Sequence, residues 1–542
     1  MTDTSLTLAE AVVDQCVAHG VQRIFGVPGG GSSLQVIEAA ARRGIPFVLT
    51  RSETPAVIMA AVTGELTGRP GAALATKGPG LANGLNGLAC ALLDRAPMLL
   101  FTDGFDPAGL AYQSHQVLDQ PAMAAPLVKG YGRLDGPAPG IETADLLDLA
   151  LTHPRGPVCV EFTAARAKRP VSGHRTRTPA PASPPGPAAR EIERARELIG
   201  AARRPAIVAG LQTVRDPAHV AALRLLADAL NCPVFPTYKA KGVLPDADPR
   251  VIGLYVGGAG ESAELSQADL IVLFGADPVE FALQPWRYPD HKVIDASLHP
   301  YERRYMAPDA SPIGPLDAIA RALAAAAPAG GSAWTEPEFA AMRSALQARL
   351  AIDSGGPITA QTVVEAARRA APAGTRLTVD AGAHMLPAMA FWQADAPNEV
   401  LISNGLATMA FALPAAIAAA LHEPQRPVIA FTGDGGLAMC LGELATAVQA
   451  GCNLTVVVFN DSALSLIGVK QARSGMAPLG VGFAPADFAT AARGLGALGI
   501  RCETPGDLDA ALARGLAHEG PAVVDVVIDP SGYIGQVERL RG

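Results

Sequence analysis

The chain has 542 residues, 49% of them hydrophobic and 17% charged, with a formal net charge of -8. This length predicts about three or four domains, the composition excludes disorder along the whole chain, and the negative charge excludes a basic nucleic-acid footprint. The N-terminus has no signal-peptide pattern, and the longest apolar stretch (409–421) is too short to span a bilayer. No cysteines form a CxxC or CxxH pair, which argues against a zinc site and a disulfide framework. We therefore expect a cytoplasmic protein that is not in a membrane.

The first predicted domain covers residues 1–170 and alternates short β-rich runs with Ala/Leu-rich segments. Its predicted strands are RIFGVPG, PFVLTRSE, AALATKGPG, PMLLFTDG and GPVCVEF. This alternation is typical of parallel sheets covered by helices. Residues 171–188 are rich in Pro and Ser, so they predict a linker rather than a packed element.

Two further blocks of the same kind follow. Residues 189–328 contain RPAIVAG, DLIVLFGAD and KVIDAS and predict a middle Rossmann-like domain. A linker helix is expected at 329–355, and residues 356–542 contain RLTVDAG, VLISNG, PVIAFTGDGG, LTVVVFND and PAVVDVVID. The sequence therefore predicts an α/β protein with three doubly wound parallel-sheet domains in a row.

The strongest local signal is a strand–helix–strand unit in the third block. An apolar strand at 427–432 runs into Gly-Asp-Gly-Gly, a helical segment is predicted at 437–450, and a second buried strand ends at Asn460. A right-handed crossover brings Asp434 and Asn460 to the carboxyl ends of neighbouring parallel strands, where such sheets bind ligands. A carboxylate and an amide oxygen suit Mg²⁺, and a glycine-rich helix N-terminus suits phosphate. GDGG alone is more often a loop, so the combination carries the prediction.

This unit, with 24 residues between GDG and the Asn, resembles the thiamine-diphosphate signature of the acetolactate synthase, pyruvate decarboxylase and benzaldehyde lyase superfamily. The resemblance implies that Asp434, Asn460 and the main-chain carbonyl of Ser462 hold the Mg²⁺ that anchors the diphosphate. It places the following glycines at the cofactor: Gly433, Gly435 and Gly436. The three blocks then follow the family order of pyrimidine-binding, middle and diphosphate-binding domains.

Thiamine chemistry also requires a carboxyl group against the aminopyrimidine, so that the exocyclic amine can remove the C2 proton of the thiazolium. The position of Glu53 before an apolar helix by itself indicates helix capping. The runs FGVPGG, RSETPAVIMAAVTGELTGRPG and TKGPGLANGLNGL follow the family order, however, and the resemblance implies that Glu53 is this acid. It implies that Glu53 reaches the partner subunit's cofactor in a homodimer or homotetramer, and that Pro28, Gly29 and Gly78 lie at the cofactor.

Two segments of the third block add cofactor contacts by the same resemblance. SNGLATMAFALPAAIAAAL places Met409 as the apolar wedge under the bent cofactor and the carbonyl of Ala407 at its exocyclic amine. DAGAH places Gly382 and His384 near the diphosphate. From composition alone Met409 would be core filler, and a lone His is more often structural.

The expected substrate contacts come from two further segments. HQVLDQPAMAAPLVKGYGRL resembles an acetolactate-synthase pattern and places Gln116 and Lys129 at family active-site positions, with His115 where the family has Phe. In SALSLIGVKQARSG, Val469 stands at or near the family's pocket Trp. Ser465 and Leu466 are expected to face the substrate.

The middle domain departs from the acetolactate synthases, which hold a non-catalytic FAD there next to an Arg-Phe-Asp-Asp-Arg-like run. Here that run is GADPVEF (275–281), without either Arg. We therefore expect FAD to be absent.

The leading hypothesis is an acetolactate synthase-like enzyme that uses thiamine diphosphate and Mg²⁺ to decarboxylate pyruvate and ligate it to a second 2-oxo acid. The alternative is a 2-oxo acid decarboxylase or 2-hydroxyketone lyase for a bulkier substrate, which the lost Trp favours. A remote alternative is a catalytically silent regulatory or nucleotide-binding paralogue. The presence of Glu53, Asp434, Asn460 and Met409 argues against that alternative.

Overall fold

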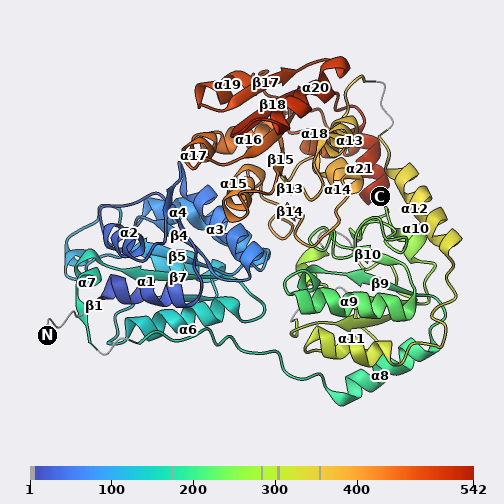
Figure 1. Cartoon of the computed structure of the whole chain (residues 1–542), viewed down its shortest axis with the longest axis horizontal. Coiled ribbons are helices and arrows are strands. Elements are labelled where there is room, and N and C mark those ends of the chain that lie inside the picture. The colour runs from blue at the N-terminus through green and yellow to red at the C-terminus, as the bar shows by residue number, and fades with distance from the viewer. Residues whose placement is uncertain (1–5, 173–174, 282–284, 302–305, 353–355, 542) are drawn as a thin grey trace. The chain divides into compact units, whose positions relative to one another are not determined.

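The computed structural model describes residues 6–172, 175–281, 285–301, 306–352 and 356–541 (Figure 1). By their internal contacts these residues form two units. Unit 1 contains residues 1–183, 413–424 and 440–452, and unit 2 contains residues 184–412, 425–439 and 453–542. No helix in the described ranges is long and apolar enough to cross a membrane. All seven cysteines lie buried in the described chain, outside any disulfide.

Unit 1 is built on a six-stranded parallel sheet in the order β3-β2-β4-β5-β7-β6. Its strands are β2 (Ile24–Gly26), β3 (Phe47–Leu49), β4 (Gly71–Ala75), β5 (Met98–Asp103), β6 (Gly130–Gly132) and β7 (Pro157–Phe162). A short antiparallel pair joins β1 (Leu6–Thr7) to β8 (Pro170–Val171). The helices of this sheet are α1 (Leu8–Ala18), α2 (Ser33–Arg42), α3 (Glu53–Thr67), α4 (Pro79–Leu93), α5 (Gln120–Ala124), α6 (Pro139–Leu151) and α7 (Ala164–Ala167), with 3₁₀ turns η1 (Gly109–Ala111) and η2 (Ala125–Leu127).

Helix α3 has apolar or small residues on nearly every side, and it is accordingly buried from Pro55 to Glu65. It packs closely on α4, since a Cβ atom added at Gly87 would lie 2.5 Å from the Cβ of Val57. A Cβ atom at Gly64 would overlap the carbonyl oxygen of Pro97. Small residues therefore set the depth at which α3 lies, and with it the position of Glu53 at its first turn.

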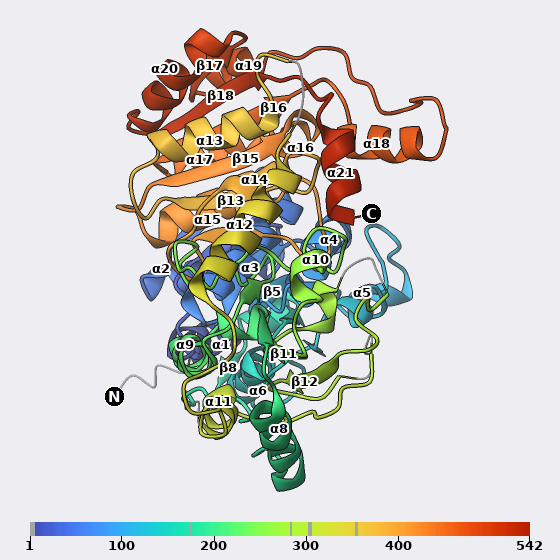
Figure 2. The ribbon, with the colours of Figure 1, turned by 90° about the vertical axis from the view of Figure 1, so that its right-hand side faces the viewer.

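Unit 2 contains two parallel sheets. The middle sheet has the order β10-β9-β11-β12, and the third sheet has the order β14-β13-β15-β16-β18-β17. The middle strands are β9 (Pro205–Ala209), β10 (Val234–Pro236), β11 (Leu270–Phe274) and β12 (Lys292–Ala296), with helices α8 (Ala189–Ala201), α9 (Pro217–Leu230), α10 (Ser262–Leu265) and α11 (Leu316–Ala324) and 3₁₀ turns η3 (Leu211–Thr213) and η4 (Pro278–Glu280). Helix α12 (Glu336–Leu350), which falls in the predicted linker, contacts α14 and α21 (Figure 2).

The third sheet carries most of the cofactor motifs predicted from the sequence. Its strands are β13 (Arg376–Val379), β14 (Val400–Ile402), β15 (Val428–Gly433), β16 (Leu454–Asn460), β17 (Leu498–Cys502) and β18 (Pro521–Val527). The helices of this part of the chain are α13 (Ala360–Ala370), α14 (Met385–Phe391), α15 (Ala412–His422), α16 (Asp434–Cys440), α17 (Glu443–Gln449), α18 (Ser465–Arg473), α19 (Phe488–Gly494), α20 (Pro505–Leu516) and α21 (Tyr533–Arg541). Helix α17 and nearly all of α15 belong to unit 1. Three parallel sheets flanked by helices confirm the predicted fold class.

The strand–helix–strand unit differs from its prediction in one respect. The helix expected at 437–450 is two helices, α16 and α17, separated at Leu441 and Gly442. Glycine is a poor helix former, which explains a break at this point. Helix α17 packs in unit 1, where the Glu443 carboxylate accepts a 3.0 Å hydrogen bond from the backbone N–H of Arg51. The domain boundaries expected from the sequence remain a proposal.

Candidate active site

A cavity of about 470 Å³ opens in unit 2 at the carboxyl ends of four neighbouring strands, β14, β13, β15 and β16. Ligands of open α/β sheets bind at this edge. The loops after these strands bring together many of the residues predicted from the sequence. Those that line the cavity are Gly382, His384, Ala407, Met409, Gly433, Asp434, Gly435, Gly436, Ser465 and Leu466.

Asp434 is the first residue of α16 and has the properties of a cation ligand. Its Oδ1 accepts a 2.7 Å hydrogen bond from the backbone N–H of Gly435. Its Oδ2 is buried and has no hydrogen-bond partner among the described residues. Burial raises the pKa of Asp434, and the backbone N–H groups of Gly435, Ser462 and Ala463 oppose that rise. A buried, unpartnered carboxylate oxygen is costly unless a cation completes it.

Asn460 ends β16 beside β15, where Gly433 pairs with Phe459. Its side-chain Nδ2 donates to the Asp525 carboxylate at 2.9 Å and to the Ala486 carbonyl at 3.0 Å. Both bonds occupy the amide nitrogen, which leaves the amide oxygen available as a ligand. The two strand ends therefore present one carboxylate oxygen and one amide oxygen, the donor types that Mg²⁺ prefers.

Ser462 has a left-handed backbone conformation, with φ of 58°, which is unusual for a residue with a side chain. Its carbonyl accepts a 2.7 Å hydrogen bond from the N–H of Phe483. A carbonyl oxygen has two lone pairs, so one remains for a metal ion. The described residues contain no cluster of three or more His, Cys, Asp or Glu side chains suited to a metal, and the predicted set instead combines a carboxylate, an amide and a carbonyl.

His384 lies at the start of α14 and stacks on Phe459, with ring centroids 5.2 Å apart. Its Nε2 is buried without a hydrogen-bond partner in the part of the chain that the structure describes. Burial lowers the pKa of His384 to about 3, so the ring is neutral near pH 7. A Cβ atom at Gly382 would lie 2.6 Å from the His384 ring. A neutral ring with one unsatisfied nitrogen suits a hydrogen bond to a bound polar group.

Asp380, the first residue of DAGAH, is a site residue that the sequence motifs do not indicate. It is buried, and its Oδ1 accepts hydrogen bonds from the N–H groups of Phe411 (2.5 Å) and Ala412 (2.9 Å). Its Oδ2 accepts a 2.6 Å bond from the Thr432 hydroxyl, and burial raises the pKa of Asp380 to about 6. Asp380 thus ties the loop that carries Met409 to strand β15.

In unit 1, Glu53 is half-buried at the first turn of α3. The side-chain amide of Asn83 donates a 2.6 Å hydrogen bond to its Oε2 and a 3.0 Å bond to the Ser52 hydroxyl. A Cβ atom at Gly80 would lie 3.3 Å from Glu53 Oε1. Asn83, which the sequence did not single out, therefore orients this carboxylate.

The structure brings Gly78 and Gln116 together in unit 1. Gly78 precedes α4 with φ of 65°, and a Cβ atom there would overlap the carbonyl oxygen of Gln116, itself left-handed with φ of 61°. Gly29 lies close to the side chains of Thr76 and Asp103, which leave no room for a Cβ atom. Gln116 is exposed in this unit, and so are two further predicted residues, Pro28 and His115.

Lys129 binds the end of a helix in unit 1. The Lys129 ammonium donates to the carbonyls of Leu149 and Thr152 (2.5 Å to the latter), at the end of α6. Burial, together with nearby Arg95 and Arg155, lowers the pKa of Lys129 to about 8. These bonds satisfy carbonyls that a helix end leaves open.

Val469 is buried on α18 and does not line the cavity. The residues that line it without having been singled out in the sequence include Tyr238, Lys470, Tyr533 and Arg541. Lys470 could have been found, because it follows Leu466 by one helical turn. The other three come from distant elements that carry no motif.

Models of three domains match successive parts of the chain. They are the N-terminal TPP binding domain, the central domain and the C-terminal TPP binding domain of thiamine pyrophosphate enzymes, at residues 6–123, 192–323 and 380–526. Together they cover most of the chain in the family's order. The chain belongs to the thiamine pyrophosphate enzymes. It is therefore an enzyme that depends on thiamine diphosphate, as the sequence predicts, and it resembles the acetolactate synthases of that superfamily.

Relatives match over nearly the full length. An acetolactate synthase of Bacillus subtilis is 29% identical over 97% of this chain and 94% of its own length. A catabolic acetolactate synthase of Raoultella terrigena is 28% identical over 96% of this chain and 95% of its own. A probable 2-ketoarginine decarboxylase of Pseudomonas aeruginosa is also 28% identical, over 96% of this chain and 94% of its own.

Proposed function

We propose that this thiamine-diphosphate-dependent enzyme is an acetolactate synthase-like carboligase that acts on 2-oxo acids. In the net reaction the C1–C2 bond of one pyruvate breaks and releases CO₂, a new bond joins its C2 to the C2 of a second pyruvate, and one proton is taken up. The observation that carries the proposal is the cavity of unit 2, whose wall combines the unpartnered carboxylate oxygen of Asp434 with the cationic side chains of Lys470 and Arg541. The first feature suits a cation on a diphosphate, and the second suits a substrate carboxylate.

Three residues would hold the metal. Asp434 and Asn460 supply a carboxylate and an amide oxygen, and Ser462 supplies its main-chain carbonyl. Mg²⁺ fits these hard donors and keeps room for phosphate oxygens. The unsatisfied Nε2 of His384, on the same cavity wall, would bind a phosphate oxygen.

Thiamine diphosphate, when bound, supplies the nucleophilic carbon and the electron sink that decarboxylation of a 2-oxo acid requires. The carboxyl group of Glu53 would hold a proton at the aminopyrimidine, with Asn83 fixing its orientation. We propose that this Glu53 belongs to the partner subunit of a homodimer or homotetramer. Met409 and the carbonyl of Ala407 would support and orient the rings.

On the substrate side, Lys470 and Arg541 would bind the carboxylate of the 2-oxo acid. The Ser465 hydroxyl donates a 2.6 Å hydrogen bond to the Asp461 carboxylate, which fixes Ser465 at the cavity wall beside Leu466. These side chains would determine which acceptor fits. We propose that FAD takes no part in the reaction.

A second candidate is a 2-oxo acid decarboxylase for a bulkier substrate. It is favoured by α18, which has no aromatic residue, while Val469 lies buried outside the cavity wall. Helix α18 therefore contributes no aromatic ring that would limit substrate length. The match to a probable 2-ketoarginine decarboxylase is as extensive as the match to an acetolactate synthase.

The test is to incubate purified protein with thiamine diphosphate, Mg²⁺ and pyruvate, and to measure CO₂, acetolactate and acetaldehyde. Glu53→Gln is the control, because it keeps the shape of the side chain and removes its acid. Acetolactate that is lost in E53Q is the expected result. Acetaldehyde as the main product would assign a decarboxylase. Cofactor binding without any pyruvate consumption would contradict the proposal, and bulkier 2-oxo acids would then be tested.

A further inference from the structure

Three hydrogen-bond donors meet at the carboxyl end of the middle sheet. They are the backbone N–H of Leu211 after β9, the hydroxyl of Thr237 after β10 and the backbone N–H of Asp277 after β11. These strands are neighbours, so their ends surround one point. In an open α/β sheet such donors bind the phosphates of a nucleotide.

The carboxylate of Glu280 already occupies this point. Its Oε2 accepts hydrogen bonds from Leu211 (2.8 Å) and Asp277 (3.0 Å), and its Oε1 accepts one from the Thr237 hydroxyl (2.5 Å). The residue is 5% exposed. A Cβ atom at Gly210 would lie 2.7 Å from Glu280 Oε2, so the carboxylate sits against the turn itself.

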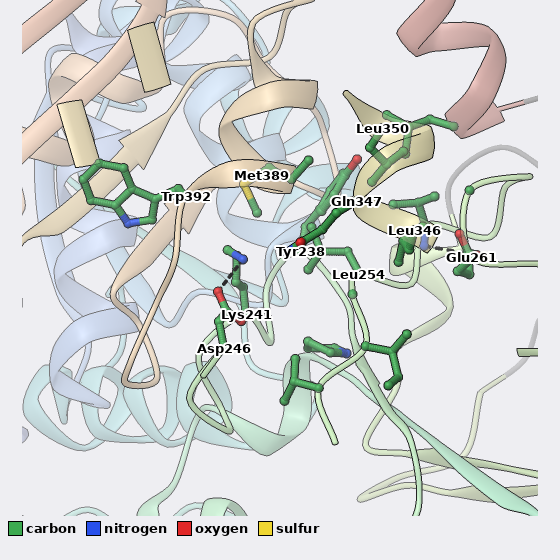
Figure 3. Close-up of a pocket in the computed structure, with 18 of the residues that line it drawn as sticks. Tyr238, Lys241, Asp246, Leu254, Glu261, Leu346, Gln347, Leu350, Met389 and Trp392 are labelled. Atoms are coloured by element: carbon green, nitrogen blue, oxygen red, sulfur yellow. Dashed lines mark hydrogen bonds and ion pairs between the residues drawn. The ribbon is translucent and has the colours of Figure 1, made fainter. Parts of the chain in front are cut away.

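A second buried glutamate, Glu261, also accepts hydrogen bonds from backbone N–H groups, in the glycine-rich loop after Tyr255. The Oε1 of Glu261 accepts hydrogen bonds from the N–H groups of Gly257 (2.8 Å) and Gly258 (3.2 Å), and the residue is 1% exposed. Figure 3 shows Glu261 at the wall of a cavity of about 70 Å³. The next N–H groups, of Ala259 and Gly260, donate to the carbonyl of Leu540 at 2.9 and 3.1 Å.

The space beside these loops is small. A cavity of about 20 Å³ lies between Ala276, Pro278 and Tyr301 at the end of the middle sheet. That volume holds about one water molecule.

We propose that Glu261 and Glu280 are built-in carboxylates that occupy the anion-binding donors of the middle domain, so that this domain binds neither FAD nor another nucleotide diphosphate. The residues present do not fit the FAD that the likeness to acetolactate synthases implies. A diphosphate would compete with two buried glutamate side chains for the same N–H groups, and at a pH where these side chains are ionised it would also meet like charge there. The run that carries two Arg residues in those enzymes has neither here, so this segment offers a nucleotide no cation and carries Glu280 instead.

The first test measures binding, so it is independent of the proposed reaction. The full-length protein is purified, denatured and examined for flavin absorbance, and its thermal midpoint is measured with FAD, with ADP and with thiamine diphosphate plus Mg²⁺. We expect no flavin, no shift with FAD or ADP, and a rise with thiamine diphosphate. Stoichiometric flavin, or a saturable rise with FAD or ADP, would overturn the proposal.

The second test removes the Glu280 carboxylate, so that the three donors are free to bind an added anion. Glu280→Ala removes the carboxylate and leaves the three donors without an acceptor, so we expect a lower thermal midpoint that formate partly restores and that formamide or sodium chloride does not. Glu193→Ala on α8, an exposed glutamate of the same domain, is the matched control and should show no response to formate. An unchanged midpoint in E280A would contradict the assignment. If E280A does not fold, Glu280→Gln is compared instead for FAD and ADP binding, and again no binding is expected.

Discussion

The carboxylate of Asp525 accepts a 2.9 Å hydrogen bond from the side-chain amide of Asn460 and so determines which end of that amide is free. The other oxygen of Asp525 accepts a 2.9 Å bond from the Phe488 N–H and pairs with Arg501 at 2.5 Å. Asp525 is fully buried. It therefore holds the Asn460 oxygen toward the proposed metal position.

Replacing Asp525 by Asn should weaken Mg²⁺ binding, because an amide at this position can turn Asn460 over. We expect the Mg²⁺ concentration for half-maximal activation to rise about 10- to 100-fold, with kcat at saturating Mg²⁺ retained. The control is Glu503→Gln, which removes an exposed partner of Arg501 and leaves Asn460 untouched. Equal Mg²⁺ requirements in the two variants would exclude this role for Asp525.

Gly436→Ala tests the close approach at the start of α16. A Cβ atom there would overlap the Asp380 carboxylate and lie 2.9 Å from the Thr432 hydroxyl. We expect the free energy of unfolding to fall by about 1–3 kcal/mol, with weaker binding of thiamine diphosphate. In the control Gly468→Ala no atom lies within 4 Å of the new methyl group, and stability should be unchanged or rise by up to about 1 kcal/mol. Chemical denaturation compares the two.

Mixing two inactive variants tests whether the active site is shared between subunits. Glu53→Gln and Asp434→Ala should each be inactive alone. If Glu53 acts on the partner's cofactor, a mixed dimer regains one intact site, and co-refolded or co-expressed variants should reach about a quarter of wild-type activity. Activity that stays at the level of the single variants would place both residues in one chain's site or show that the chains do not associate, which light scattering distinguishes.

Lys129→Met should affect stability more than catalysis. The Lys129 ammonium donates to two carbonyls at the end of α6, so its loss leaves them unsatisfied. We expect a loss of about 1–3 kcal/mol in the free energy of unfolding and a kcat near that of the wild type. A large fall in kcat with unchanged stability would instead support the catalytic role implied by the sequence resemblance.

The stability of the protein should depend on pH through Glu280. Burial raises its pKa from 4.5 to about 7, against the hydrogen bonds that lower it and with Asp277 as a charged neighbour that raises it. The native state therefore binds more protons than the unfolded chain between these values, and stability falls as pH rises from 4.5 to 7. The contribution is about 3 kcal/mol. Denaturation at pH 5 and pH 8 should show a smaller difference for Glu280→Gln than for wild type or Glu193→Gln.

Much of the third domain could be predicted because its signals are local. Asp434 and Asn460 each follow a continuous apolar strand, and parallel neighbours place their ends together whatever the rest of the fold does. The helix between them was less predictable: α16 and α17 divide at Gly442, and α17 packs in unit 1. Gly442 weakens the helix at this point, but tertiary contacts also decide whether a helix breaks there, and the sequence does not show those contacts.

The sequence by itself determined the family, the three parallel sheets and the positions of Glu53 and the GDGG segment, since strand periodicity and motif spacing are properties of short stretches of chain. Only the tertiary structure decided the direction and partners of individual side chains. Tyr238 lines the same cavity as Tyr533 and Arg541 of α21, although it lies hundreds of residues before them in the chain. Lys129 is turned to a helix end, and Glu280 to the donors of three strands. A side chain's partners depend on which elements pack beside it, and that choice is made by the whole core.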